Sequence, residues 1–117
     1  MMRNIVLGLG VALAGCASVP PPTTQMAVAR EAVARADGTP EVVSLAPNEV
    51  ERARMKLASA ERAMAAHDYV IARRLADEAE ADARSAEARS LSVKNERALV
   101  EVRQALAKLR EDLARRS

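Results

Sequence analysis

The sequence predicts an all-α protein: a helical hairpin or short up-down bundle that continues into a long C-terminal helix. Alanine occupies 26 of the 117 positions and has the highest helix propensity of any residue. After Pro47 the remaining 70 residues contain no glycine or proline, so none of the strong helix breakers is present there. Apolar residues also recur at spacings of three and four, which is the period of one helix face.

The composition allows one small domain with a thin core. Half of the residues are hydrophobic, but there is no Phe or Trp and only one Tyr, Tyr69. Because alanine buries little apolar area, we expect close helix packing through small side chains and no deep ligand cavity. Charges of both signs are interspersed and sum to +2. No basic patch alternates with aromatic residues, which argues against a nucleic-acid partner.

Residues 1–15 have the three parts of an export signal: a basic start at Arg3, a nine-residue apolar stretch and small residues before Cys16. Even extended to Val19, the apolar run is 15 residues long, whereas a membrane-spanning helix needs about 20. Three glycines in this run disfavour a buried helix of the domain. The segment is therefore interpreted as a signal peptide.

Leu13-Ala14-Gly15-Cys16 resembles the lipobox of bacterial lipoproteins, in which a dedicated peptidase cuts before the cysteine. The resemblance implies that Leu13, Ala14 and Gly15 are recognised by that peptidase and that Cys16 carries a diacylglycerol and an N-acyl chain. Several chains are needed because a single acyl chain binds a membrane only reversibly. Ala17, where an aspartate would signal retention in the inner membrane, implies the periplasmic side of the outer membrane. An intermolecular disulfide is the alternative for this lone cysteine.

Residues 16–24 are expected to form a tether between the anchor and the domain. The run Pro20-Pro21-Pro22 favours the extended polyproline II conformation, which acts as a stiff spacer. Such a spacer would hold the domain away from the bilayer surface.

The first helix is predicted over residues 25–37. Thr23 or Thr24 is expected to cap its start. Gly38 suits the position just after the helix, and Pro40 cannot continue it. The apolar face of this helix consists of Met26, Ala29, Val33 and Ala36.

Residues 41–46 are expected to be a connector, since no second strand exists to pair with Val42-Val43. Pro47 suits the first position of a second helix, and Glu49 lies in its positively polarised first turn. The apolar face of the second helix consists of Val50, Ala53, Leu57, Ala60 and Met64.

A turn is predicted at residues 66–69, with Asp68 as the N-cap of a third helix. A helix running straight through this turn is disfavoured, because it would place polar side chains on the apolar face. The apolar stripe of the third helix consists of Ala72, Leu75, Ala79, Ala83 and Ala86.

Beyond residue 91 the chain is an amphipathic segment with a coiled-coil repeat. Its apolar residues follow spacings of three, four, three and four, as in the a and d positions of heptads. We call this set the leucine seam: Leu99, Val102, Leu106, Leu109 and Leu113. An unbroken third helix would be ~70 Å long against ~30 Å for the second, so the seam would extend past its intramolecular partner. A break near residues 90–95, with the chain folding back, is the alternative.

Three blocks in residues 25–90 occur in a characteristic order: Leu45-Ala46-Pro47, then Ala53-x-x-x-Leu57-x-x-Ala60, then Asp68-Tyr69-x-x-Ala72-x-x-Leu75-Ala76. This order resembles the domain of unknown function 4398 family. Members of that family are commonly small, exported and often lipid-anchored, which agrees with the interpretation of the N-terminus. His67 departs from the family pattern, because such turns often have glycine there. After this helical module, residues 91–117 are expected to form the C-terminal amphipathic helix that carries the leucine seam.

No arrangement of residues predicts catalysis. His67 is the only histidine, so a typical zinc site cannot be completed. The acidic run at residues 77–82 lies on a predicted helix, where the carboxylates point around the cylinder and do not converge on a cation. We therefore expect no enzyme, no metal and no cofactor apart from the lipid on Cys16.

The expected function is that of an outer-membrane-anchored periplasmic lipoprotein, a structural or protein-interaction module of the cell envelope. Its leucine seam would bind a second copy of the chain or another envelope protein. One alternative is a small-ligand carrier or enzyme with a pocket near His67 and Tyr69. A second alternative is contact with peptidoglycan through the charged helix faces.

Overall fold

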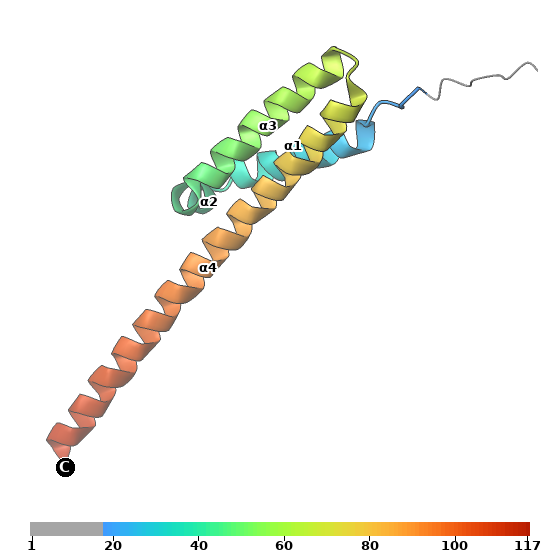
Figure 1. The fold of residues 1–117 in the computed structure, drawn as a ribbon. Helices are drawn as coiled ribbons and strands as arrows, with labels where there is room; N and C mark the ends of the chain where they lie inside the picture. Colours follow the sequence, from blue (N-terminus) through green and yellow to red (C-terminus); the bar gives the residue numbers. More distant parts are fainter. Residues whose placement is uncertain (1–17) are drawn as a thin grey trace, which may run out of the picture.

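The computed structural model describes residues 18–117, which form four α-helices and no strand (Figure 1). They are α1 (Thr23–Asp37), α2 (Pro40–Leu45), α3 (Pro47–Ala65) and α4 (Tyr69–Arg116). The predicted all-α fold with a long C-terminal helix is confirmed. The predicted signal peptide and Cys16 lie outside the described residues.

The first half of α4 pairs with α3 as a helical hairpin, and α1 packs against both (Figure 1). The short α2 contacts all three of the other helices and closes one end of this bundle. The buried residues come mainly from the predicted apolar faces, with Leu57, Met64 and Leu75 partly buried at the edge of the core. The fully buried small residues of α3 and α4 include Ala53, Ala60, Ala76, Ala79 and Ala83.

The core is built from alanine, and Met26 and Val50 are its largest fully buried side chains. A methyl group in place of a longer side chain lets two helix axes approach closely, so that dispersion contacts extend to the backbone atoms. Packing of this kind is specific because an extra methylene has no space to occupy.

The cap predicted for α1 is wrong. Pro22 is the N-cap residue, no side chain caps the helix, and both Thr23 and Thr24 lie inside the first turn. The reason is that Pro22 is buried and its carbonyl accepts the Met26 amide at 3.0 Å, so the helix begins two residues earlier than expected. At the other end Gly38 follows the helix as predicted, although it keeps a right-handed φ of −75°.

The connector expected at residues 41–46 is mostly helical, because α2 occupies Pro40–Leu45. Pro40 lies in the first turn, where its missing N–H has no consequence, and Glu41 follows it at the positive end of the helix. Val42 is buried in the core. The same proline that ends α1 therefore starts α2, as Pro47 starts α3.

The predicted turn between α3 and α4 is present. The Asp68 amide donates to the Ala63 carbonyl at 2.9 Å, and the His67 amide donates to the Met64 carbonyl at 3.1 Å. These two bonds form a Schellman motif, which requires a left-handed residue at the position that His67 occupies. His67 has a φ of 59°, so it adopts the conformation that glycine commonly supplies. Asp68 caps α4 by accepting the Ile71 amide at 3.3 Å.

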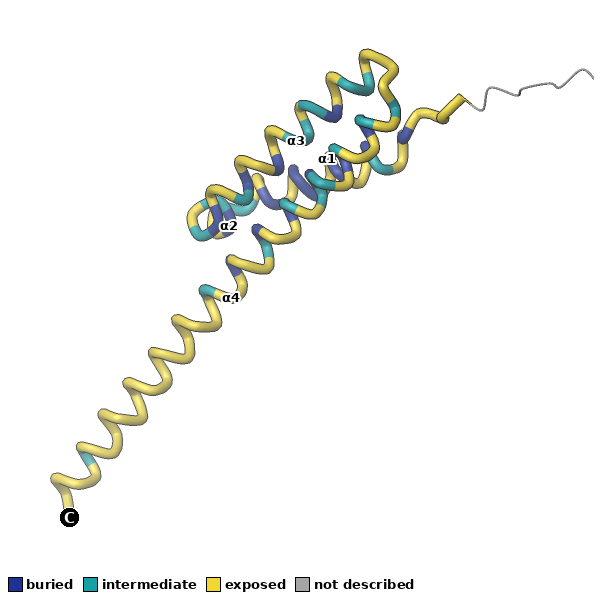
Figure 2. The backbone as a smooth tube through the Cα atoms, in the orientation of Figure 1, coloured by how far each residue is buried: buried dark blue, intermediate teal, exposed yellow. Residues whose placement is uncertain are grey.

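α4 continues without a break for 48 residues, about 72 Å, so the fold-back near residues 90–95 does not occur. Its last buried residue is Ser90 (Figure 2). The Lys94 ammonium still reaches Glu41 of α2 at 2.8 Å, but beyond that point the helix has solvent on all sides. We call residues 91–116 of α4 the overhang.

Replacing Ala79 with leucine tests the alanine packing. Ala79 is fully buried, so Ala79→Leu should overpack the bundle and lower the free energy of unfolding by about 1–3 kcal/mol. Thermal unfolding followed by circular dichroism measures the loss. Ala81→Leu is the matched control, because Ala81 lies two residues away on the exposed side of the same helix. Equal melting temperatures for the two variants would contradict close packing at Ala79.

Candidate functional site

The leucine seam lies wholly on the overhang and is exposed to solvent. The exposed fractions of its five side chains range from 47% for Leu106 to 59% for Leu113. In Figure 2 this part of α4 is almost entirely coloured as exposed. Apolar side chains in such a row are unusual on a soluble surface unless another surface covers them.

The seam faces away from the bundle. The residues of α4 that pack on the bundle are Ala72, Ala76, Ala79, Ala83, Ala86 and Ser90. At 3.6 residues per turn, the middle of the seam lies about 140° around the helix axis from the middle of this buried stripe. The side of the overhang that continues the buried stripe is polar, with Arg97, Glu101, Gln104, Lys108 and Arg115. α4 therefore presents two apolar stripes, one to the bundle and one to the opposite side.

An open hollow of about 420 Å³ lies where the seam begins. Small residues make it, because Ala88 and Ser92 leave space between the larger side chains of α4. Its lining residues are Ala88, Leu91, Ser92, Asn95, Glu96 and Leu99. The outward face of α4 thus remains shaped for contact from the end of the bundle into the seam.

The acidic run forms ion pairs that hold the helices together. Asp82 lies 2.8 Å from the Lys56 ammonium and 3.6 Å from the Arg52 guanidinium, both on α3. Glu78 pairs with Arg74 at 2.7 Å and with Lys56 at 3.4 Å. Among the described residues no group of three or more acidic, histidine or cysteine side chains is arranged to hold a metal ion.

These ion pairs shift two pKa values. Hydrogen bonds from Arg74 and then from Lys56 lower the pKa of the Glu78 carboxyl below 4.5. The hydrogen bond to Asp82, with further help from Glu78, raises the pKa of Lys56 above 10.5. Both groups are charged at neutral pH, so their chemistry here is structural.

Similar ion pairs connect α1 to the rest of the bundle. Arg35 of α1 pairs with Glu87 of α4 at 2.6 Å, which raises the pKa of the guanidinium further. Arg30 of α1 pairs with Glu61 of α3 at 3.0 Å. Because the apolar core is thin, these surface contacts help to set the order and spacing of the helices.

His67 and Tyr69 lie together at the turn. The His67 Nδ1 atom and the Tyr69 hydroxyl are 2.7 Å apart, and the two rings meet edge to face. His67 is exposed and Tyr69 is half-buried. The geometry gives both side chains a local partner that fixes the turn.

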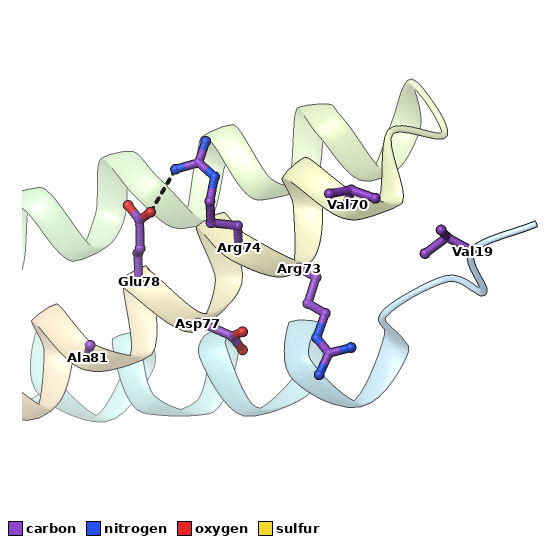
Figure 3. A pocket seen from close by; sticks show the side chains of 7 residues that line it. All are labelled: Val19, Val70, Arg73, Arg74, Asp77, Glu78 and Ala81. Atoms are coloured by element: carbon purple, nitrogen blue, oxygen red, sulfur yellow. Dashed lines mark hydrogen bonds and ion pairs between the residues drawn. The ribbon is translucent and has the colours of Figure 1, made fainter.

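A second open hollow, of about 540 Å³, lies beside the N-terminal segment (Figure 3). Val19 contributes from that segment, and all the other lining residues belong to α4: Val70, Arg73, Arg74, Asp77, Glu78 and Ala81. Neither His67 nor Tyr69 lines it. The hollow places Val19 at the turn end of the bundle, next to the first residues of α4.

The family model for the domain of unknown function DUF4398 matches residues 24–102, which is most of the chain. The chain belongs to the DUF4398 family. The match covers the bundle and the first part of the overhang, and includes Leu99 and Val102 of the seam.

A crystal structure of a DUF4398 family protein from Pseudomonas aeruginosa PAO1 is similar to this fold, with a TM-score of 0.71. The two sequences are 36% identical over 84% of this chain and 100% of that one. The comparison with curated proteins found no match.

The residues predicted for lipidation, Leu13, Ala14, Gly15 and Cys16, lie outside the described part of the chain. Within residues 18–117, none of the four helices combines the length and the apolar character that crossing a bilayer requires. α4 has the length, but charged residues occur along all of it.

The Glu78 ion pairs predict a pH dependence of stability. Since folding lowers the pKa of Glu78, its contribution is present above pH 4.5 and is lost as the pH falls through the lower folded value. Thermal unfolding from pH 7 to pH 2 should therefore show a decline that is shallower in Glu78→Gln. Glu101→Gln, an exposed change on the overhang, is the control and should follow the unmodified chain. A Glu78→Gln profile identical to that of the control would contradict the assignment.

Proposed function

We propose that this protein is a structural, protein-binding module of the bacterial cell envelope, held at the outer membrane by lipid on Cys16 and binding its partner through the leucine seam. The observation that supports the proposal is the seam itself: five large apolar side chains in coiled-coil spacing, half-exposed on a helix that extends beyond its own bundle. A partner helix is the surface that such spacing fits.

Simple energetics favour a reversible contact. Burying the remaining half of each seam side chain contributes about 1 kcal/mol, or about 10 kcal/mol for two facing seams. Association of two proteins costs about 4–15 kcal/mol in lost freedom of motion. The two amounts are similar, so the seam alone supports only weak binding in dilute solution. Confinement to one membrane surface raises the local concentration and shifts the balance toward the complex.

The position of the N-terminal segment separates the proposed anchor from the seam along the length of α4. Val19 lies beside Val70, at the end of α4 that is furthest from the seam. Along the helix, Leu99 is about 45 Å and Leu113 about 65 Å from Val70. A tether fixed to a bilayer near Val19 would therefore hold the molecule by its bundle end, and the seam would lie away from the point of attachment.

Charged substitutions in the seam should remove binding without affecting the fold. Leu106 and Leu109 are exposed, so Leu106→Glu with Leu109→Glu should leave the circular dichroism spectrum of the bundle unchanged. Crosslinking in intact cells should then lose the adducts formed by the unmodified chain. Lys108→Glu, on the polar side of the same helix turn, is the control and should retain them. Adducts that persist in the double variant would show that the seam is not the binding surface.

The anchor has a separate test. Cys16→Ser removes the thiol that would accept the lipid, so incorporation of an alkynyl fatty acid should fall to background and the precursor should stay uncut. Membrane fractionation should show the change in location. Ser18→Ala is the control, because Ser18 lies two residues after Cys16 and is not expected to carry lipid. Incorporation of the fatty acid should continue in this variant. Labelling of the Cys16→Ser chain at the normal level would remove the anchor from the proposal.

A further inference from the structure

The two flanks of the leucine seam differ in size and charge. In the heptad that places Leu99 at a and Val102 at d, the g positions next to the seam are Ala98, Ala105 and Asp112. The e positions on the other flank are charged: Glu96, Arg103 and Arg110. One edge of the seam therefore has small residues at its start and centre and Asp112 at its end. The other edge carries an acidic residue at one end and basic residues at the centre and the other end.

The charged residues at the e positions form no ion pair with the described part of the chain. Among residues 18–117, none of the ion pairs includes Glu96, Arg103 or Arg110, whereas elsewhere on the overhang Arg115 pairs with Glu111 at 2.9 Å. Glu96 accepts only a long hydrogen bond from the Ser92 hydroxyl of its own helix, at 3.5 Å. The charges of these three side chains can therefore pair with a second molecule.

A parallel pairing of two overhangs would leave these charges without a partner. In parallel coiled coils a g residue of one helix meets an e residue of the other. That arrangement places Ala98 beside Arg103 of the second copy, Ala105 beside Arg110, and Asp112 beside Ser117. None of these contacts brings opposite charges together.

In an antiparallel pairing the e positions of the two copies meet each other, and so do the g positions. One register gives the best combination of apolar contacts along the seam and opposite charges beside it. When Val102 faces Leu106 of the second copy, Leu99 faces its Leu109, and every seam residue except Leu113 meets another seam residue. Leu113 then faces Asn95. Glu96 meets Arg110 of the second copy, and this contact occurs twice because the pairing is symmetric.

The centre of this arrangement is also consistent with close approach. Ala105 meets its own counterpart near the two-fold axis, where small side chains let the helices come together. Arg103 also meets its counterpart there, which is one repulsive contact against two attractive ones. The long arginine side chain can direct its charge outward into solvent.

Shifting the register by one heptad is less favourable in either direction. One shift places Arg103 against Arg110 of the second copy, twice. The other also brings Glu96 next to Arg103 of the second copy, twice. However, it places Leu106 against Asn95, Leu109 against Ser92 and Leu113 against Ala88, so most of the seam no longer covers itself. We infer that the partner of the seam is a second copy of this chain, bound antiparallel with Val102 facing Leu106 and Glu96 facing Arg110.

This inference rests on the proposed function and specifies its partner. Because the seam faces away from the bundle, the two bundles would lie at opposite ends of the paired overhangs and would not collide. The result is a symmetric dimer in which each surface patch contacts the same patch on the other copy.

Thiol crosslinking of the full-length chain in a Gram-negative host tests the pairing. Ala105→Cys should give a dimer with a short thiol-to-thiol crosslinker, since residue 105 lies at the two-fold axis. Leu99→Cys should give none, because its counterpart in the second copy lies ten residues away along the helix, about 15 Å. The unmodified chain, whose Cys16 would carry lipid, is the baseline.

Charge reversal within the Ala105→Cys chain then tests the register. Glu96→Arg or Arg110→Glu alone turns two attractive contacts into repulsive ones and should slow initial crosslinking about tenfold. The two changes together should restore the rate. Arg97→Glu, on the polar side of the overhang, is the control and should have little effect.

The outcomes separate the inference from the proposed function. Crosslinking through Leu99→Cys and not Ala105→Cys would overturn the antiparallel register but retain the seam as the binding surface. If neither variant gives a dimer while seam substitutions still abolish other adducts, the partner is a different envelope protein and the inference is wrong. Loss of rate in both single variants without recovery in the double variant would also overturn it.

Discussion

The structure depends on the close packing of alanine residues on α3 and α4 inside the bundle. The methyl groups of Ala53, Ala60, Ala76 and Ala79 are fully buried, so little space remains around them for any larger group. Small side chains contribute little area each, so the contact must be continuous along the hairpin to be stable. This requirement explains the repeated three and four spacing of alanine. It also explains why the bundle ends where the stripe ends, at Ser90.

Because the core is thin, ion pairs on the surface also help to determine how the helices are arranged. Lys56 with Asp82, and Arg35 with Glu87, connect helices that share few large apolar contacts. Exposed ion pairs contribute little stability individually, but wrong pairings would place like charges together. The charge pattern therefore helps to select one arrangement of helices from several that alanine stripes alone would permit.

Much of this fold was predictable from periodicity. The spacing of apolar residues, the capping residues and the absence of helix breakers predict α1, α3 and α4 and the turn at Asp68. They also predict that α4 extends beyond α3. α2 was missed because six residues show no periodic pattern, and its helicity depends on burial of Val42 by the other helices. The ion pair between Lys56 and Asp82 could not be predicted from the sequence, since many other acidic residues were available to Lys56 at different positions along the chain.

The candidate site divides in the same way. The seam was visible in the spacing from Leu99 to Leu113, but the direction that it faces was not. Two stripes on one helix can be compared in phase only when the helix is known to be unbroken, and the sequence left a fold-back near residues 90–95 open. The unbroken α4 of the structure is what places the seam opposite the bundle.

The continuity of α4 has a consequence for the kinetics of recognition. Starting a helix is unfavourable because several residues must be ordered for the first hydrogen bond, whereas each added residue then gains one bond. In α4 the starting step takes place at the Asp68 cap and within the bundle, so the overhang only propagates a helix that already exists. Its amide protons should exchange progressively faster toward Arg116, as the end frays. A partner that binds the seam as proposed would therefore meet a preorganised surface, and its binding would not have to wait for a segment to fold.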